Sequence, residues 1–423
     1  MERLIFHIDV NSAFLSWEAV RRVKAGEPDL RLIPSAIGGD RAKRTGVILA
    51  KSIPAKKLGI KTGEPVAMAL RKCPDLYLAR PDFRLYEKNS RAFVKICEKY
   101  APVVERFSID ECFLDMTGTG QLYPDPIQIA YTIKDEIRDM LGFTVNIGIG
   151  SNKLLAKMAS DFEKPDKVHT LFLKEVPQKL WPLPVRDLFS VGGATAEKLE
   201  KLNVRTIGDL AKISSEALQT VLGNKMGEHL YRYANGIDDT PVCGEARAAK
   251  GYSISTTVEE DVTDLEQANH ILLALADSVS SRMRADDMKT TCVAVTIRSH
   301  DFRDRSHQIK LDHATDITGE IFTYAKRAFS VLWDQRTPLR LIGVSLTGIT
   351  HGEAEQISMF EDEKKEKARK VDRVVDFIRS QYGMGTIVRG TVYHSSLKVG
   401  KKYTAHMETD SLEMSQTRKG EKE

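Results

Sequence analysis

The sequence predicts a multidomain protein of the α/β and α+β classes, on three observations. Its 423 residues exceed one ordinary domain and correspond to about two to four. Short β-compatible runs alternate with helical patterns up to about residue 172, whereas residues 173–240 are helical and punctuated by glycine. Alternating strands return between residues 252 and 350. With 42% apolar and 29% charged residues, the chain can bury such cores beneath a solvated surface.

The N-terminal segment predicts a strand, a helix and a small basic subdomain. The run RLIFHI (residues 3–8) is apolar and β-compatible, and it ends at Asp9. Asn11 and Ser12 are helix-capping residue types, and a helical pattern follows them. Residues 33–65 then mix short apolar runs with Gly, Pro and many basic residues, which indicates a separate small subdomain.

The next part predicts a hairpin, a helix and a strand. Residues 103–107 and 112–116 have strand patterns and flank the sequence Ser-Ile-Asp-Glu, so carboxylates lie at the hairpin tip. Residues 127–140 form an amphipathic helical pattern, and residues 143–150 form another strand. Ser151 is placed to cap the helix that follows.

The C-terminal third predicts strands around two helices, and then a charged tail. The strands are STTVEEDV, TTCVAVTIRS and LRLIGVSLTGI, within residues 252–350. Residues 241–251 contain Pro and Gly without hydrophobic periodicity and predict a linker. Residues 361–370 are a charge run, residues 371–383 predict one more short helix, and the last residues predict disorder.

Composition excludes several classes of protein. No apolar run reaches the roughly 18 residues of a membrane-spanning helix, and the N-terminus lacks a secretory pattern, so we expect a cytoplasmic protein without a membrane partner. The five irregularly spaced cysteines contain no Cys-x-x-Cys pair, which argues against a zinc site, and their odd number argues against a disulfide framework. The net charge of +4 permits a nucleic-acid partner without requiring one.

Three carboxylates are the strongest chemical signal. Asp9 ends a predicted strand, and Asp110 and Glu111 lie at the hairpin tip. Carboxylate oxygens are the ligands Mg²⁺ prefers, and two such ions roughly 3.5–4 Å apart suit in-line displacement at phosphorus. In isolation, however, acidic residues at turns are more often simply solvated.

Three segments together resemble the Y-family, or translesion, DNA polymerases of the DinB/UmuC kind. They are FHIDVNSAF (6–14), SIDECFLD (108–115) and GIGSNKLLAKMASDFEKP (148–165), in family order and spacing, and the resemblance covers about residues 1–400. It implies a polymerase right hand whose two Mg²⁺ ions are held by Asp9, Asp110, Glu111 and the carbonyl of Val10. It also implies the domains: palm 1–12 and 79–172, fingers 13–78, thumb 173–240, linker 241–251, little finger 252–350 and C-terminal tail 351–423.

The resemblance assigns residues around the metals. Phe14 is the steric gate that excludes a 2′-hydroxyl, the alternative being an ordinary helix-core residue. Lys56 and Lys164 bind the triphosphate, whereas Lys153 and Lys157 are expected at the surface or facing DNA. Where DinB-like members have Tyr-x-Ala-Arg, this chain has Ile-Pro-Ala-Lys at residues 53–56, which favours the UmuC branch at this segment.

DNA contacts are predicted in two places. SVGGATAEKLEKL (190–202) resembles a helix-hairpin-helix in which Gly192 and Gly193 open a phosphate-binding helix, although an ordinary helical turn fits too. Basic residues of the little finger would contact phosphates, the alternative being a solvated face: Lys289, Arg298, Arg303, Arg305 and Lys310.

A short peptide after the last predicted strand resembles the one that docks bacterial polymerases on the sliding clamp. Its anchor residues are Gln356, Ile357, Met359 and Phe360, and the alternative is that Phe360 packs back on the little finger.

These features predict a template-directed, low-fidelity translesion DNA polymerase, a monomer acting on primer–template DNA and dNTPs with the sliding clamp. Another palm-type two-metal enzyme such as a nucleotidyl cyclase, or a non-catalytic DNA- or clamp-binding accessory factor, remains an alternative.

Overall fold

The computed structural model describes residues 3–39, 46–245, 248–351, 363–383 and 385–390. The chain forms two compact units, the first made of Met1–Gly38 with Val47–Ala246 and the second containing Arg247–Glu423. Each unit has its own hydrophobic cores. No helix in the described part of the chain is long and apolar enough to cross a membrane.

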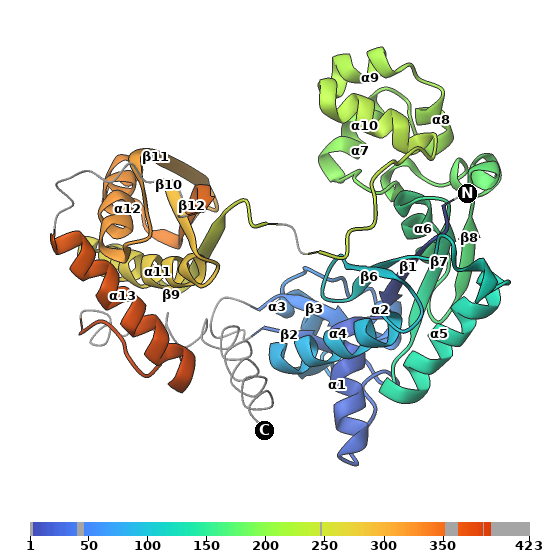
Figure 1. Cartoon of the computed structure of the whole chain (residues 1–423), viewed down its shortest axis with the longest axis horizontal. Coiled ribbons are helices and arrows are strands. Elements are labelled where there is room, and N and C mark those ends of the chain that lie inside the picture. Colours follow the sequence, from blue (N-terminus) through green and yellow to red (C-terminus); the bar gives the residue numbers. More distant parts are fainter. Residues whose placement is uncertain (1–2, 40–45, 246–247, 352–362, 384, 391–423) are drawn as a thin grey trace. The chain divides into compact units, whose positions relative to one another are not determined.

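The first unit is built on a five-stranded sheet with the order β5-β6-β1-β7-β8 (Figure 1). Its strands are β1 (Ile5–Val10), β5 (Val103–Arg106), β6 (Glu111–Asp115), β7 (Val145–Gly150) and β8 (Val168–Leu171). Side chains of β1 alternate between two cores, as the period of a strand requires. Phe6 and Ile8 pack with helices α1 (Ala13–Lys24), α4 (Phe83–Cys97) and α5 (Pro126–Leu141), whereas Ile5 contributes to the core that includes Ala156 of α6.

Helix α6 (Lys153–Ser160) lies very close to β7. A Cβ atom at Gly148 would fall 1.9 Å from the carbonyl oxygen of Ala156, so only glycine allows this approach. The helix is capped by Asn152, whose side chain accepts from the Leu155 amide at 2.8 Å, and not by Ser151 as the sequence predicted. Ser12, the other predicted cap, precedes α1 without a side-chain capping bond.

Two smaller parts complete the first unit. A three-stranded sheet, order β3-β2-β4, packs with two short helices around a core that includes Ile48 and Val66. Its elements are β2 (Ser35–Gly38), β3 (Ile48–Lys51), α2 (Ile53–Lys57), α3 (Val66–Lys72) and β4 (Tyr77–Ala79). The helical part comprises α7 (Gly193–Lys201), α8 (Ile207–Ala211), α9 (Ser215–Leu222) and α10 (Asn224–Ala234). Its core includes Leu155 and Met158, so α6 belongs to the sheet and to the helical part together.

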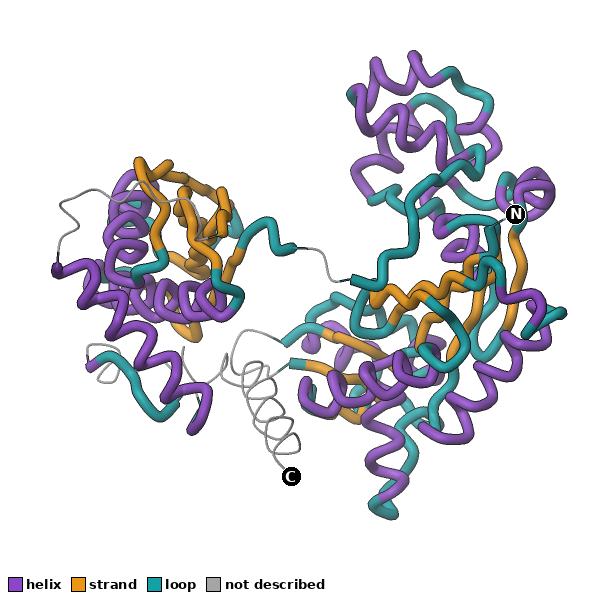
Figure 2. The backbone as a smooth tube through the Cα atoms, viewed as in Figure 1, coloured by secondary structure: helices purple, strands orange, loops and turns teal. Residues whose placement is uncertain are grey.

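The second unit is a four-stranded antiparallel sheet, order β11-β10-β12-β9, packed with two helices (Figure 2). Its elements are β9 (Tyr252–Val262), α11 (Leu265–Ala285), β10 (Met288–Ser299), β11 (Asp304–Thr315), α12 (Thr318–Leu332) and β12 (Leu339–His351). The sequence predicted all of these except β11. That strand is mostly exposed and polar, and therefore lacks the apolar alternation that identifies a half-buried strand.

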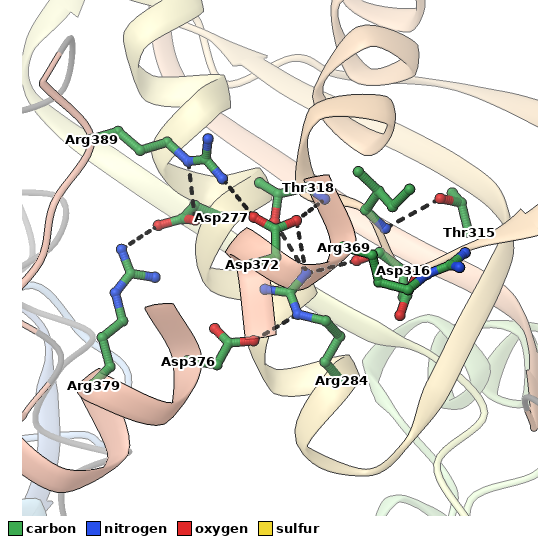
Figure 3. Close-up of polar contacts among 11 residues, drawn as sticks. Asp277, Arg284, Thr315, Asp316, Thr318, Arg369, Asp372, Asp376, Arg379 and Arg389 are labelled. Atoms are coloured by element: carbon green, nitrogen blue, oxygen red, sulfur yellow. Dashed lines mark hydrogen bonds and ion pairs between the residues drawn. The ribbon is translucent and has the colours of Figure 1, made fainter. Parts of the chain in front are cut away.

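A last helix, α13 (Glu363–Tyr382), packs on the second unit through ion pairs (Figure 3). The side chains of Arg284 and Asp372 are only 6% and 7% exposed, although both are charged. The pairs join Arg284 to Asp372 and Asp376, Arg369 to Asp316, Arg379 to Asp277, and Arg389 to Asp277 and Asp372. The predicted charge run and short helix are thus one helix, whose polar residues form its buried face.

Candidate active site

The sheet of the first unit brings the three predicted carboxylates together. Strands β1 and β6 are antiparallel, and Asp9 is directly opposite Glu111 in their register. The amide of Val10 donates to the carbonyl oxygen of Asp110 at 3.0 Å, which continues the pairing to the hairpin tip. β1 therefore runs through Asp9 to Val10, one residue beyond the end that the sequence predicted.

Burial and a like charge both act on Asp9. Burial is the main cause that raises the pKa of Asp9 to about 7, and the neighbouring Glu111 carboxylate contributes to the same shift. Lys164 opposes this shift, since its Nζ lies 3.0 Å from Asp9 Oδ2. Two partly buried carboxylates in direct contact form a site that a cation would stabilise.

The oxygen donors fit a hard divalent cation such as Mg²⁺. The pair of adjacent carboxylates at Asp9 and Glu111 is the structural observation that supports this fit. In the described residues, no three acidic, His or Cys side chains converge as a ready-made metal site. Glu111 Oε1 instead accepts from Lys157 Nζ at 2.6 Å.

Helix α6 supplies two lysines that the sequence analysis misplaced. Lys153 and Lys157 are each only 8% exposed, so the prediction that they lie at the surface is wrong. Lys153 Nζ lies 2.7 Å from both carboxylate oxygens of Glu105, and Lys157 pairs with Glu111. The sequence shows their i, i+4 spacing, but only the close approach of α6 to the sheet identifies their partners.

His7 also adjoins the carboxylates, and the sequence analysis gave it no role. It is fully buried on β1, its Nδ1 lies 2.8 Å from Ser160 Oγ, and its Nε2 lies 4.0 Å from Glu111 Oε1. Burial, reinforced by nearby lysines, lowers the pKa of His7 well below its ordinary value, so the ring is neutral.

A pocket joins the carboxylates to the small sheet. Its lining contains six of the residues predicted from the sequence: Asp9, Val10, Phe14, Lys56, Asp110 and Lys164. Glu111 does not line it. One side of the pocket is thus acidic, and the small sheet and α2 bring Lys51 and Lys56 to it.

Phe14 is held in place by other aromatic rings. Its ring stacks on Tyr86 with centroids 4.5 Å apart and an interplanar angle of 7°, and Phe83 meets it edge-on. The ring is half-buried and still lines the pocket, so it combines a packing role with an exposed edge.

The segment predicted as a helix-hairpin-helix includes the start of α7. Gly192 is the N-cap of this helix, and a Cβ at Gly192 or Gly193 would meet nothing within 4 Å. Ser190 has φ of 80°, in the left-handed region that favours glycine.

The basic residues of the second unit differ in their surroundings. Arg298 makes two bonds to Asp304, and Arg303 pairs with Asp301, so carboxylates of the same hairpin balance both charges. Lys310 is opposite Cys292 in the β10–β11 register, and Arg305 is opposite Ile297. Since Ile297 is buried, Lys289, Arg298 and Lys310 belong to the sheet face away from the core, and Arg305 does not. The predicted clamp peptide, residues 356–360, lies outside the described residues.

Carboxylates on adjacent strands, facing lysines across one pocket, are typical of enzymes that transfer phosphoryl groups of polyanionic substrates. Comparison with known proteins agrees. Residues 8–161 match the impB/mucB/samB family, residues 249–359 match its C-terminal domain, and residues 186–238 match the thumb domain of DNA polymerase iota.

Relatives match along nearly the whole chain. DNA polymerase IV of Clostridium acetobutylicum is 43% identical over 399 residues, covering 94% of this chain and 100% of that protein. DNA polymerase IV 1 of Bacillus subtilis is 34% identical and covers 92% of each chain. The solved Y-family DNA polymerase chimera Dbh-Dpo4(243-245)-Dbh has the same fold, with a TM-score of 0.72 and 22% identity, covering 82% of this chain and 100% of that one.

The chain therefore belongs to the Y family of DNA polymerases, and its relatives are of the DNA polymerase IV, or DinB, type. The segment at residues 53–56 alone favoured the UmuC branch, so that local departure does not follow the similarity of the whole chain.

Proposed function

We propose that this Y-family polymerase adds a deoxynucleotide from a dNTP to a primer 3′-OH in the pocket between the carboxylates and the small sheet. Because the chain belongs to this family, it is a DNA-directed DNA polymerase that carries out low-fidelity translesion synthesis. The observation that carries the proposed site is the single pocket lined by Asp9, Asp110, Phe14, Lys56 and Lys164.

Asp9, Asp110, Glu111 and the Val10 carbonyl would hold two Mg²⁺ ions. When bound, such ions stabilise negative charge on the attacking and leaving oxygens. The chain itself supplies the carboxylate pair on β1 and β6, and Lys157 and Lys164 balance that pair from outside the sheet. Lys56 and Lys164 would bind the triphosphate and stabilise charge on the departing pyrophosphate.

Phe14 would select the sugar. Its ring cannot move aside without breaking its stack on Tyr86, so it would exclude a 2′-hydroxyl by contact. This rigidity is what a steric gate requires.

Primer–template DNA would be held through its phosphates. A Cβ atom at Gly192 or Gly193 would meet nothing within 4 Å, so this side of the backbone is open to a phosphate at the start of α7. Lys310 on the outer sheet face of the second unit is a stronger candidate than Arg298 and Arg303, because carboxylates already balance those two arginines. Lys289 lies on the same face of the sheet.

The proposed clamp partner and oligomeric state come from the sequence. We propose that residues 356–360 bind the replicative sliding clamp, and that the polymerase acts as a monomer in the cytoplasm. Deleting these five residues should remove stimulation by clamp and leave distributive synthesis unchanged. If the deletion reduced clamp-stimulated and distributive synthesis equally, the segment would have a structural role and would not bind the clamp.

The decisive experiment is primer extension on an undamaged template and on one with an abasic site. Purified protein, Mg²⁺ and dNTPs should give distributive extension and bypass. The Asp110→Ala/Glu111→Ala double variant should give neither, with duplex binding retained. Extension by the double variant would refute the metal site. Product from nucleotide alone, without template, would favour the cyclase, which the matches to a thumb and a C-terminal polymerase domain already disfavour.

A further inference from the structure

Lys51 is a pocket residue to which the sequence analysis assigned no role. It ends strand β3, and it lines the same pocket as Asp9, Phe14 and Lys56. Its Nζ donates to Thr62 Oγ1 at 2.9 Å, and Thr62 lines the pocket as well. The ammonium group is therefore held in position at the small-sheet side of the pocket.

No carboxylate in the described part of the chain forms an ion pair with Lys51. Within the described residues, no ion pair involves Lys51 or Lys56, in contrast to Lys164 across the same pocket. Glu64 attracts Lys51 weakly, but this carboxylate is already engaged by Lys72 Nζ at 2.5 Å. Partial burial lowers the pKa of Lys51, and the charge of Lys56 lowers it further. Two neighbouring cations in one pocket are stabilised when an anion binds between or beside them.

The residues near Lys51 leave room for a second phosphate contact. The side chain of Ile53 offers no hydrogen-bond donor, and Lys56 offers one point charge without the two-pronged geometry of a guanidinium. A second, positioned lysine adds charge and hydrogen-bonding capacity beside Lys56.

We propose that Lys51, positioned by Thr62, is a second phosphate-binding cation that contacts the triphosphate of the incoming nucleotide beside Lys56. The proposal rests on the proposed polymerase function of this pocket. It assigns Lys51 to binding of the substrate's polyphosphate and not to the chemistry at the primer end.

The test compares Lys51→Met, Lys51→Arg and Thr62→Val with a matched control, Lys57→Met, an exposed lysine of α2 that does not line the pocket. Steady-state primer extension would give KM for the dNTP and kcat separately. A charge-assisted contact of ordinary strength predicts a KM for Lys51→Met about ten- to a hundredfold higher, with kcat changed less than about threefold. Lys51→Arg should retain a low KM, Thr62→Val should show a smaller rise, and Lys57→Met should match the wild type.

A second readout isolates the polyphosphate from the base and sugar. Inorganic pyrophosphate should inhibit extension by Lys51→Met less strongly than extension by the wild type or by Lys57→Met. An unchanged KM and unchanged pyrophosphate inhibition in Lys51→Met, with a normal melting temperature, would overturn the proposal. So would a KM that rises equally in Lys57→Met. If the wild type itself does not extend primers, the proposed polymerase function is wrong. If the wild type extends primers and Lys51→Met behaves like it, only the role of Lys51 is wrong.

Discussion

The lysines of α6 and those of the small sheet lie near the same carboxylates but have opposite surroundings. Lys153 and Lys157 are buried, and each neutralises a glutamate of the central sheet. Lys51 and Lys56 reach the pocket from β3 and α2, and no described carboxylate pairs with them. The buried, paired lysines of α6 complete the fold, whereas the two lysines of the small sheet are available to a ligand.

The largest expected effect breaks the pairing on α6. Lys157→Met leaves Glu111 without its cation, and loss of one partner of a largely buried pair costs about 3 kcal/mol of unfolding free energy. Denaturant unfolding would measure this loss. Because a divalent cation can replace the ammonium beside Glu111, added Mg²⁺ should restore more stability to this variant than it adds to the wild type.

Lys153→Met is the matched control for that experiment. It removes the cation from Glu105, a carboxylate outside the proposed metal site, so its stability loss should be similar and Mg²⁺ should not reverse it. Equal rescue of both variants by Mg²⁺ would show that the ion acts elsewhere.

The next prediction concerns Phe14, an uncharged residue of the pocket. Phe14→Ala should admit ribonucleotides and retain DNA synthesis, because the exclusion is steric and not electrostatic. Removing such contacts changes discrimination by about 1–3 kcal/mol, or about 10–200-fold in the ratio of kcat/KM for dNTP and NTP. Single-nucleotide incorporation would measure that ratio. Unchanged discrimination would return Phe14 to a packing role on Tyr86.

A third change extends the comparison to the second unit. Arg284 is buried and pairs with Asp372 and Asp376 of α13, as the α6 lysines pair with their glutamates. Arg284→Met should therefore cost about 2 kcal/mol and loosen α13. Hydrogen exchange along residues 363–383 would rise, while exchange in β10 would not. The exposed Arg303→Met, paired only at the surface, should change neither.

The smallest effect on stability is expected in the small sheet. Lys56→Met removes an exposed cation that pairs with no described carboxylate, so the free energy of unfolding should change by less than about 0.5 kcal/mol. The KM for dNTP should nevertheless rise about tenfold, which corresponds to about 1.4 kcal/mol. A large loss of unfolding free energy in Lys56→Met, with an unchanged KM for dNTP, would show that Lys56 stabilises the fold and does not bind the substrate.

Much of this molecule follows from local sequence patterns. The strand before Asp9, the hairpin around Asp110 and Glu111, and the helices of the second unit were predicted because hydrophobic periodicity and turn residues are local. The family resemblance, carried by short motifs in order, identified the pocket residues Phe14, Lys56 and Lys164. Strand β11 was missed because its exposed, polar residues lack that periodicity.

The partners of charged residues were decided only by the tertiary structure. Lys157 and Lys51 are both lysines near a recognised motif, yet one is paired with Glu111 and the other, held by Thr62, faces the pocket. Helix α13 likewise has a polar buried face, which hydrophobic patterning does not predict. Pairing depends on which elements pack together, and Gly148 sets one such approach by letting α6 touch β7. The sequence determines which residues carry charge, whereas three-dimensional proximity and burial determine whether that charge serves the fold or a ligand.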